Sequence, residues 1–140
     1  MGRRDVGDQG PWDGAGMTVI LDAGALIALE RRDSRMIALI LAVTRNEIPT
    51  FVPAGVLAQV WRGSARQHDI ARLLATDAVR VDSLDEDAAK AVGTLLGASG
   101  TSDVVDGHVV LLARRTRGTV YTSDEGDLHG IDPRLDVVSI

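Results

Sequence analysis

The 140-residue sequence contains no cysteine, which excludes disulfide bonds and thiolate zinc sites and is compatible with the cytosol. It is also poor in aromatic residues, with two tryptophans, one tyrosine and one phenylalanine, so the core must be built from aliphatic side chains. No apolar run is long enough to span a bilayer, and the basic start of the chain is not followed by the apolar segment of a secretory signal. We therefore expect a cytoplasmic protein that does not enter membranes.

Lysine is almost absent, since Lys90 is the only one among 15 basic residues. Arginine binds phosphate groups with two parallel hydrogen bonds and is the better phosphate ligand, although a GC-rich genome explains the same bias more simply. The formal net charge of −5 does not favour a general nucleic-acid coat protein. The excess of acid instead directs attention to where the carboxylates lie.

The length suits one domain with a substantial core. Residues 1–16 are rich in glycine and have no apolar period, so we expect a flexible leader, or an over-extended start, before a domain over residues 17–140. Within that domain, short apolar runs alternate with segments of helical periodicity. This alternation predicts an α/β fold of three layers, with a central, mostly parallel five-stranded sheet and helices on both faces.

The expected strands are 18–21, 49–52, 78–81, 119–122 and 136–139. The expected helices are 23–31, 34–46, 53–62, 65–75, 86–97, a helix ending near residue 115, and a helical turn at 125–129. Polar residues just before three of these helices are candidate N-caps: Ser34, Asp85, and Ser102 or Thr101.

Acidic residues follow two of the expected strands. Asp22 ends the first apolar run, Asp124 ends the fourth, and Asp127 follows three residues later. Asp103 and Asp106 lie three residues apart at the start of another apolar stretch. Open α/β sheets bind ligands at the carboxyl ends of their strands, and several carboxylates gathered there stay ionised together only around a cation. The pattern therefore predicts a Mg²⁺ or Mn²⁺ site, of the kind that handles phosphates.

Four segments in order resemble the motifs of PIN-domain proteins. Residues 17–31 resemble their first strand and helix, 53–62 the segment that usually carries the second acid, 103–113 the third acidic motif and 121–128 the closing Thr-x-Asp motif. The resemblance covers residues 17–140 and is nearest to the VapC-type toxins of toxin–antitoxin pairs. It implies a PIN-like fold and a Mg²⁺-dependent endoribonuclease that cuts RNA. It also implies a homodimer held inactive by a small antitoxin protein.

The resemblance also assigns roles to residues. It implies that Asp22, Asp106 and Asp124 are catalytic and hold the metal, with Asp103 as a further ligand. Gln59 stands where the family usually has glutamate; its carbonyl oxygen can bind a hard cation but brings no charge, so we expect weaker metal binding. The candidate supporting residues are Gln59, Ser123 and Asp127, with Ser123 or Thr122 hydrogen-bonding a ligand carboxylate or the phosphate. The candidate RNA-binding residues are Arg62 and Arg66, within a basic cluster that also includes His68 and Arg72.

Each of these residues also has a purely structural explanation. Asp22 can serve only as a helix N-cap, Asp103 as a first-turn acid favoured by the helix dipole, and Asp127 as a surface acid. Gln59 and His108 can be packing residues, Trp61 a core or dimer residue, and the basic cluster a solvated helix face.

Two other functions compete with the ribonuclease. The first is a PIN-fold binding module, weakened at Gln59, that acts through RNA or protein contacts alone. The second is an aspartyl-phosphate domain, either a receiver or a dehalogenase-like phosphatase. A receiver needs a lysine after a late strand, whereas Lys90 lies in an expected helix. The phosphatase needs a second aspartate where this chain has Gly24.

Overall fold

The computed structural model describes residues 17–140, so the predicted leader at 1–16 lies outside the described residues. All five strands run parallel in one sheet, in the order β3-β2-β1-β4-β5. The strands are β1 (Val19–Leu21), β2 (Thr50–Pro53), β3 (Val79–Asp82), β4 (Thr119–Thr122) and β5 (Asp136–Ser139). The predicted α/β fold is thereby confirmed, and the sheet is entirely rather than mostly parallel.

The helices are α1 (Ala23–Glu30), α2 (Ser34–Asn46), α3 (Ala54–Val60), α4 (His68–Leu74), α5 (Glu86–Ser99), α6 (Val104–Thr116) and α7 (Glu125–Ile131). A short 3-10 turn, η2 (Ala65–Gln67), precedes α4, where the sequence predicted one continuous helix. Gln67 explains the break. Its buried side chain accepts hydrogen bonds from the backbone N–H groups of Arg62 and Gly63 and donates one to the carbonyl of Val60.

Aspartate side chains cap four of the helices within residues 17–140, namely α1, α2, α5 and α6. Asp85 caps α5 as predicted, through the backbone N–H of Ala88. The predictions of Ser34 and of Ser102 or Thr101 were wrong, because Asp33 caps α2 and Asp103 caps α6. In both cases the aspartate is adjacent to the predicted residue, and its carboxylate accepts from backbone N–H groups of the first helical turn.

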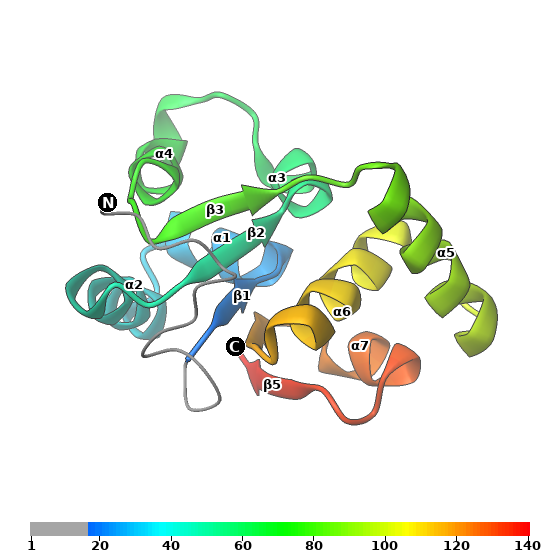
Figure 1. The fold of residues 1–140 in the computed structure, drawn as a ribbon. Coiled ribbons are helices and arrows are strands. Elements are labelled where there is room, and N and C mark those ends of the chain that lie inside the picture. The colour runs from blue at the N-terminus through cyan, green and yellow to red at the C-terminus, as the bar shows by residue number, and fades with distance from the viewer. Residues whose placement is uncertain (1–16) are drawn as a thin grey trace.

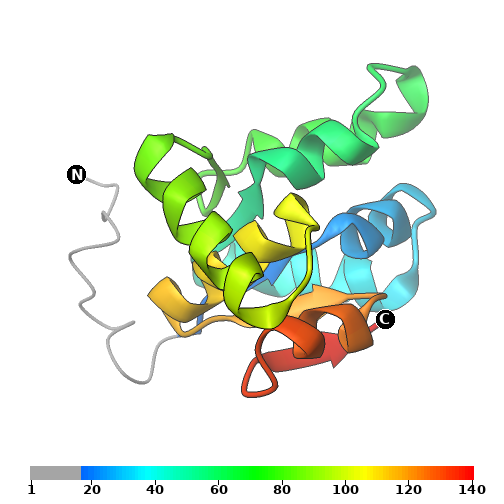
Figure 2. The same ribbon diagram turned by 90° about the vertical axis from the view of Figure 1, so that its right-hand side faces the viewer.

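Helices cover both faces of the sheet (Figure 1). On one face α6 packs against β1, β2 and β4, and Figure 2 shows α5 and α7 beside it. On the other face α1 contacts β1 and β4 and packs with α2, α3 and α4. The central strand β1 is therefore buried along its whole length, with Ile20 and Leu21 fully inaccessible. No helix among residues 17–140 has both the length and the apolar character needed to cross a membrane.

The strand order reverses at the centre of the sheet. From β1 the chain first adds β2 and β3 on one side and then crosses to add β4 and β5 on the other. After β1 and β4 the chain leaves the sheet toward opposite faces, and open α/β sheets usually bind ligands at the carboxyl ends of such strands. At this point Asp22 directly follows β1, and Asp124 lies two residues beyond the end of β4.

Candidate active site

Asp22 is held by two hydrogen bonds at the end of β1. It is 4% exposed; one carboxylate oxygen accepts from the N–H of Ala23 at 2.7 Å and the other from the hydroxyl of Thr122 at 2.8 Å. The Thr122 hydroxyl in turn accepts the N–H of Asp124 at 2.8 Å. A single buried hydroxyl therefore links the two acids that follow the adjacent strands β1 and β4. The structural role of Asp22 as the N-cap of α1 is real, but it involves only one of the two carboxylate oxygens.

Asp22 is an unfavourable place for a negative charge in spite of these hydrogen bonds. Burial raises its pKa above the usual aspartate value, and the charges of Asp124 and Asp103 raise it further. The hydrogen bonds from Thr122 and Ala23 act in the opposite direction without cancelling the effect of burial.

Asp106 shows the strongest perturbation. Its pKa is raised to about 7, first by burial and then by the charges of Asp103, Asp22, Asp127 and Asp124. Asp103 is close because it caps α6 and accepts the N–H of Asp106 at 3.0 Å. The structure thus brings the five predicted acids into one electrostatic neighbourhood at the carboxyl edge of the sheet.

This donor set suits a hard divalent cation. It consists of carboxylate oxygens, which Mg²⁺ and Mn²⁺ prefer, and a cation would remove the repulsion that raises the pKa of Asp106. As the side chains stand, no three Asp, Glu or His residues within 17–140 converge closely enough to enclose an ion. Mg²⁺ commonly keeps several water molecules and binds proteins through one or two carboxylates, so this spacing fits a cation bound partly through water.

Gln59 lies on α3, and its side chain is exposed. Within residues 17–140 it makes no side-chain hydrogen bond, so a packing or hydrogen-bonding role is not observed there. The start of α3 packs closely on the start of α6, where a Cβ atom on Gly55 would lie 3.0 Å from Cγ2 of Val105. Gln59 follows one helical turn later, and its role at the metal stays a prediction.

Ser123 lies beside Gly24 on the other side of the chain from Thr122, since successive residues at a strand end point in opposite directions. Its hydroxyl is so close to Gly24 that a Cβ atom there would clash with it. Ser123 therefore lines a hollow between α1, α2 and the end of β5. The hydroxyl that does contact a carboxylate of the site is that of Thr122.

The two predicted RNA-binding arginines lie near the end of α3 and the turn that follows. The guanidinium of Arg62 donates to the carbonyls of Trp61 at 2.7 Å and Ala58 at 3.3 Å. The side chain of Arg66 is 85% exposed and lies 3.8 Å from a carboxylate oxygen of Glu30. Each side chain is thus partly engaged by the protein itself, and their contact with RNA stays a prediction.

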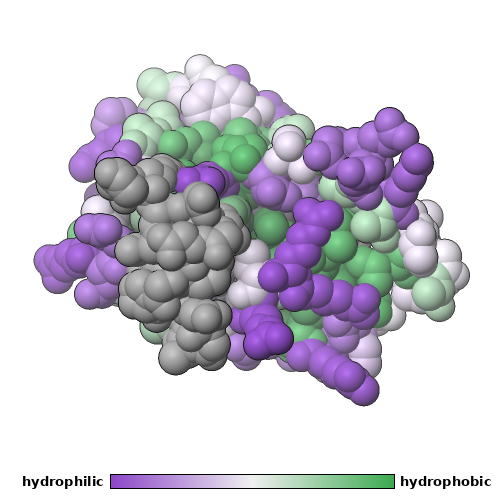
Figure 3. All heavy atoms as spheres, in the orientation of Figure 1, coloured by the Kyte–Doolittle hydropathy of each residue, from purple (hydrophilic) through white to green (hydrophobic). Residues whose placement is uncertain are grey.

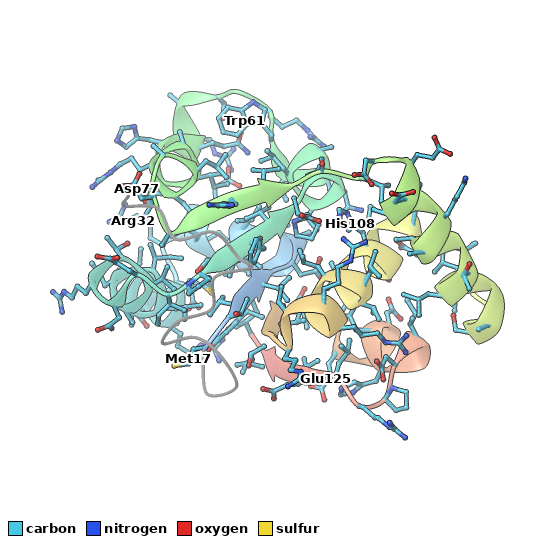
Figure 4. The ribbon with its side chains drawn as sticks, viewed as in Figure 1. Met17, Arg32, Trp61, Asp77, His108 and Glu125 are labelled. Atoms are coloured by element: carbon cyan, nitrogen blue, oxygen red, sulfur yellow. The ribbon has the colours of Figure 1, made fainter. Side chains whose placement is uncertain are left out.

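The structure gives Trp61 and His108 clear positions, and it confirms the packing interpretation of His108. Trp61 is 40% exposed and projects from the end of α3 at the periphery of the molecule, so it is not a core residue (Figure 4). His108 is almost fully buried between α6 and the end of β3, where its Nε2 atom lies 2.9 Å from Asp82. Sequence reasoning missed Asp82 because the two residues are 26 positions apart and share no local pattern.

No protein-family model and no curated protein matches the sequence. Among solved structures, the chain is similar to VapBC2 from Rickettsia felis bound to a DNA fragment from their promoter, with a TM-score of 0.64 and 14% identity over 89% of this chain and 99% of that one. It is similar to FitAB bound to an IR36 DNA fragment, with a TM-score of 0.60 and 18% identity over 86% of this chain and 94% of that one. It is also similar to PAE2754 from Pyrobaculum aerophilum, with a TM-score of 0.58 and 14% identity over 87% of this chain and 90% of that one.

These likenesses extend over nearly the whole of each compared chain, and at this level of identity they concern the fold. Together with the all-parallel sheet of order β3-β2-β1-β4-β5, they confirm the PIN-like fold that the four motifs predicted. The strand order also differs from the 2-1-3-4-5 order of receiver domains, and Lys90 lies on α5 in an exposed pair with Glu86. The receiver alternative is therefore wrong.

Proposed function

We propose that this protein is a Mg²⁺- or Mn²⁺-dependent endoribonuclease, the VapC-type toxin of a toxin–antitoxin pair. The observation that carries the proposal is the group of five carboxylates at the switch point of the sheet, where the pKa of Asp106 is raised to about 7. Uncompensated charge of this kind destabilises a fold, and it is typical of a site arranged for a ligand of opposite charge.

The residues of the site have distinct proposed roles. Asp22, Asp106 and Asp124 hold the cation, directly or through water, and Asp103 adds negative charge from the end of α6. Thr122 holds the Asp22 carboxylate at the carboxyl edge of the sheet and fixes the backbone of Asp124. A bound cation would supply a lowered pKa for an attacking water and charge neutralisation at the phosphodiester.

The partner follows from the family resemblance and from the structural likeness to VapBC2 and FitAB. The VapBC2 structure includes a DNA fragment from the promoter of the VapBC2 proteins. The FitAB structure includes the IR36 DNA fragment. We propose a small antitoxin protein as the partner of this chain and a homodimer as its own assembly.

Cleavage of single-stranded RNA by the purified, partner-free protein tests the proposal. We expect cutting in Mg²⁺ or Mn²⁺, none in EDTA, and a loss of at least about 1,000-fold in Asp22→Asn and Asp106→Asn, because charge stabilisation supplies much of the barrier reduction. Asp87→Asn is the matched control, since Asp87 is an exposed acid on α5. Equal cutting by Asp106→Asn and wild type, or cutting that persists in EDTA, would show a contaminating nuclease.

A second candidate is the binding module without catalysis. It is favoured by two observations, the uncharged and exposed Gln59 and the lack of a ready-made three-residue metal cluster within residues 17–140. A calorimetric titration of the free protein with Mg²⁺ or Mn²⁺ separates the candidates. If the protein is a nuclease, wild type binds the ion, even if weakly, and Asp106→Asn loses that binding. If it is a binding module, wild type and Asp106→Asn give the same titration.

A further inference from the structure

A hollow of roughly 500 Å³ runs along α1 beside the acidic site. Its lining residues are Gly24, Ile27, Ala28, Arg31, Asp33, Arg35, Ser123 and Ile140. One end is bounded by Gly24 and Ser123, which belong to the two chain segments that carry Asp22 and Asp124 beyond β1 and β4. The other end is at Arg31, about 10 Å further along the helix at 1.5 Å per residue. The hollow therefore begins at the proposed site and leads away from it.

The two ends of the hollow differ in chemistry. Ile27 and Ile140 contribute apolar surface, and Ile27 is 37% exposed, while the far end carries two guanidinium groups. Arg31 forms no ion pair with any residue of 17–140. Among residues 17–140, the one ion pair of Arg35 is with Asp33 at 3.7 Å; the Arg35 side chain is 65% exposed, so this contact is weak. An apolar wall followed by free arginines matches a nucleotide, with its base on the wall and a phosphate on the arginines.

Local structure holds the two arginines at this end. Arg32, between them, adopts a left-handed backbone with φ of 60° and ends α1 abruptly. Its guanidinium pairs with Asp69 of α4 at 2.6 Å, which ties the turn to the neighbouring helix α4. Asp33 then starts α2 by accepting from the backbone N–H of Arg35. One oxygen of the Asp33 carboxylate is engaged in capping, and Asp33, Arg31 and Arg35 all border the hollow.

Electrostatics requires a feature of this kind. Five neighbouring carboxylates repel a polyanionic strand, and a cation at the site offsets that repulsion only locally. Arg62 gives less of this compensation, because the carbonyls of Trp61 and Ala58 hold its guanidinium, whereas the contact of Arg66 with Glu30 at 3.8 Å is as weak as that of Arg35 with Asp33.

We propose that the hollow is the subsite for the RNA strand next to the cleaved bond, with Arg31 and Arg35 binding a phosphate one or two nucleotides away. The inference rests on the proposed ribonuclease function and adds the path of its substrate. In this arrangement the Ser123 hydroxyl faces the sugar–phosphate backbone where the strand enters the hollow, which gives this predicted supporting residue a role in substrate binding.

The test compares Arg31→Ala and Arg35→Ala with Arg45→Ala, a matched exposed arginine on α2 that does not line the hollow. Cleavage of a labelled single-stranded RNA of 12 nucleotides gives kcat and KM for each. Binding of the same RNA to Asp106→Asn proteins carrying each change, in Mg²⁺ at several salt concentrations, gives Kd without cutting. Thermal melting verifies that the variants fold.

We expect Arg31→Ala and Arg35→Ala to raise KM and Kd by about 5- to 20-fold, with kcat within about twofold of wild type and a salt slope reduced by about one phosphate contact. Arg45→Ala should change KM less than twofold.

Other outcomes overturn the inference in distinguishable ways. If wild type cuts RNA and all three alanine variants match it, the hollow does not bind the substrate and the proposed function stands. If the two variants lose only the affinity for the antitoxin, the hollow is a protein-docking site instead. If wild type neither binds nor cuts RNA, the proposed function and this inference fail together.

Discussion

The two ends of α6 carry opposite electrostatics. At its start, Asp103 and Asp106 face further carboxylates, and the pKa of Asp106 is raised to about 7. At its end, Arg114 donates to Asp132 at 2.7 Å, and this hydrogen bond holds the pKa of Asp132 below the usual value. The start of the helix thus collects charge that the protein does not compensate, and the end pairs its charge within the fold.

Within one helix, the difference separates charge that is paired inside the fold from charge that the proposed function leaves for a ligand. A compensated pair stabilises the folded state, whereas uncompensated acids destabilise it until a ligand arrives. The buried His108–Asp82 contact lies between the two ends and holds the middle of α6 against β3. Figure 3 shows hydrophilic and apolar side chains interleaved over α5 and α6. The hydropathy of the surface therefore does not distinguish the start of α6, where the proposed site lies, from its end. The charge partners of the side chains do distinguish them.

After loss of the acids themselves, the largest expected effect concerns the hydroxyl that orders the acidic end. Thr122→Val keeps the side-chain shape but removes the hydrogen bond to Asp22 and leaves the N–H of Asp124 without its acceptor. We expect the rate of RNA cleavage to fall by about 10- to 100-fold, the usual scale for partners that orient metal ligands. Thr122→Ser should retain most of the activity.

Thr50→Val is the control for this change. Thr50 is an equally buried threonine at the start of β2, and its hydroxyl donates to the carbonyl of Ile48 at 2.9 Å. Thr50→Val should lower the free energy of unfolding, and the folded protein should cleave RNA at the wild-type rate. Equal rates for Thr122→Val and wild type would show that the hydroxyl bridge is irrelevant to the site.

The same Asp→Asn change should have opposite effects at the two ends of α6. In EDTA, Asp106→Asn should raise the free energy of unfolding by about 1–2 kcal/mol, because it removes a buried and repelled charge, and Tm by several degrees. Asp132→Asn should lower it by about 1 kcal/mol, since its partner Arg114 is half exposed and the pair is partly screened. Thermal melts of both variants beside wild type measure the difference.

Added Mg²⁺ sharpens this comparison. It should raise the Tm of wild type and of Asp132→Asn but not that of Asp106→Asn, since only a protein that binds the ion gains stability from it. A lower Tm for metal-free Asp106→Asn than for wild type would mean that the Asp106 carboxylate stabilises the fold, which contradicts a role as an uncompensated charge that awaits a ligand.

A smaller effect is expected at Gln59. Gln59→Glu adds one negative charge to the proposed site and should tighten Mg²⁺ binding by about 3- to 10-fold, measured by calorimetry. Gln59→Ala provides the comparison for loss of the amide oxygen. Identical affinities in all three proteins would show that the side chain points away from the ion.

The smallest effect is the pH dependence of metal-free stability. The pKa of Asp106 is higher in the folded state than in the unfolded chain, so stability should fall as pH rises from about 4 to about 7. The pKa of Asp132 is lower in the folded state, so its contribution should be present above about pH 4 and be lost as pH falls through the folded value. Urea unfolding across pH measures both slopes.

Each slope has its own control. Asp106→Asn should flatten the decline toward neutral pH and leave the acid limb, and Asp132→Asn should weaken the acid limb alone. A decline toward neutral pH that persists unchanged in Asp106→Asn would assign it to another group.

Much of the fold could be predicted because its signals are local. The apolar runs ending at Leu21 and Thr122 and the helical periods between strands depend on neighbouring residues, and they placed every strand to within about one residue. The capping residue of α2 and the start of α6 at Val104 were less well predicted, because two polar residues in a row both qualify as caps and only the backbone geometry decides between them.

The candidate site divides in the same way. The sequence by itself determined which acids follow which strands, because that depends on order along the chain, and a parallel sheet brings strand ends to one edge. Only the tertiary structure decided that Thr122 links Asp22 to Asp124, that His108 pairs with Asp82, that Trp61 is exposed, and that Arg31 and Arg35 border one hollow. Those facts depend on side-chain directions and on contacts between residues far apart in sequence, which packing of the whole domain fixes and no local pattern encodes.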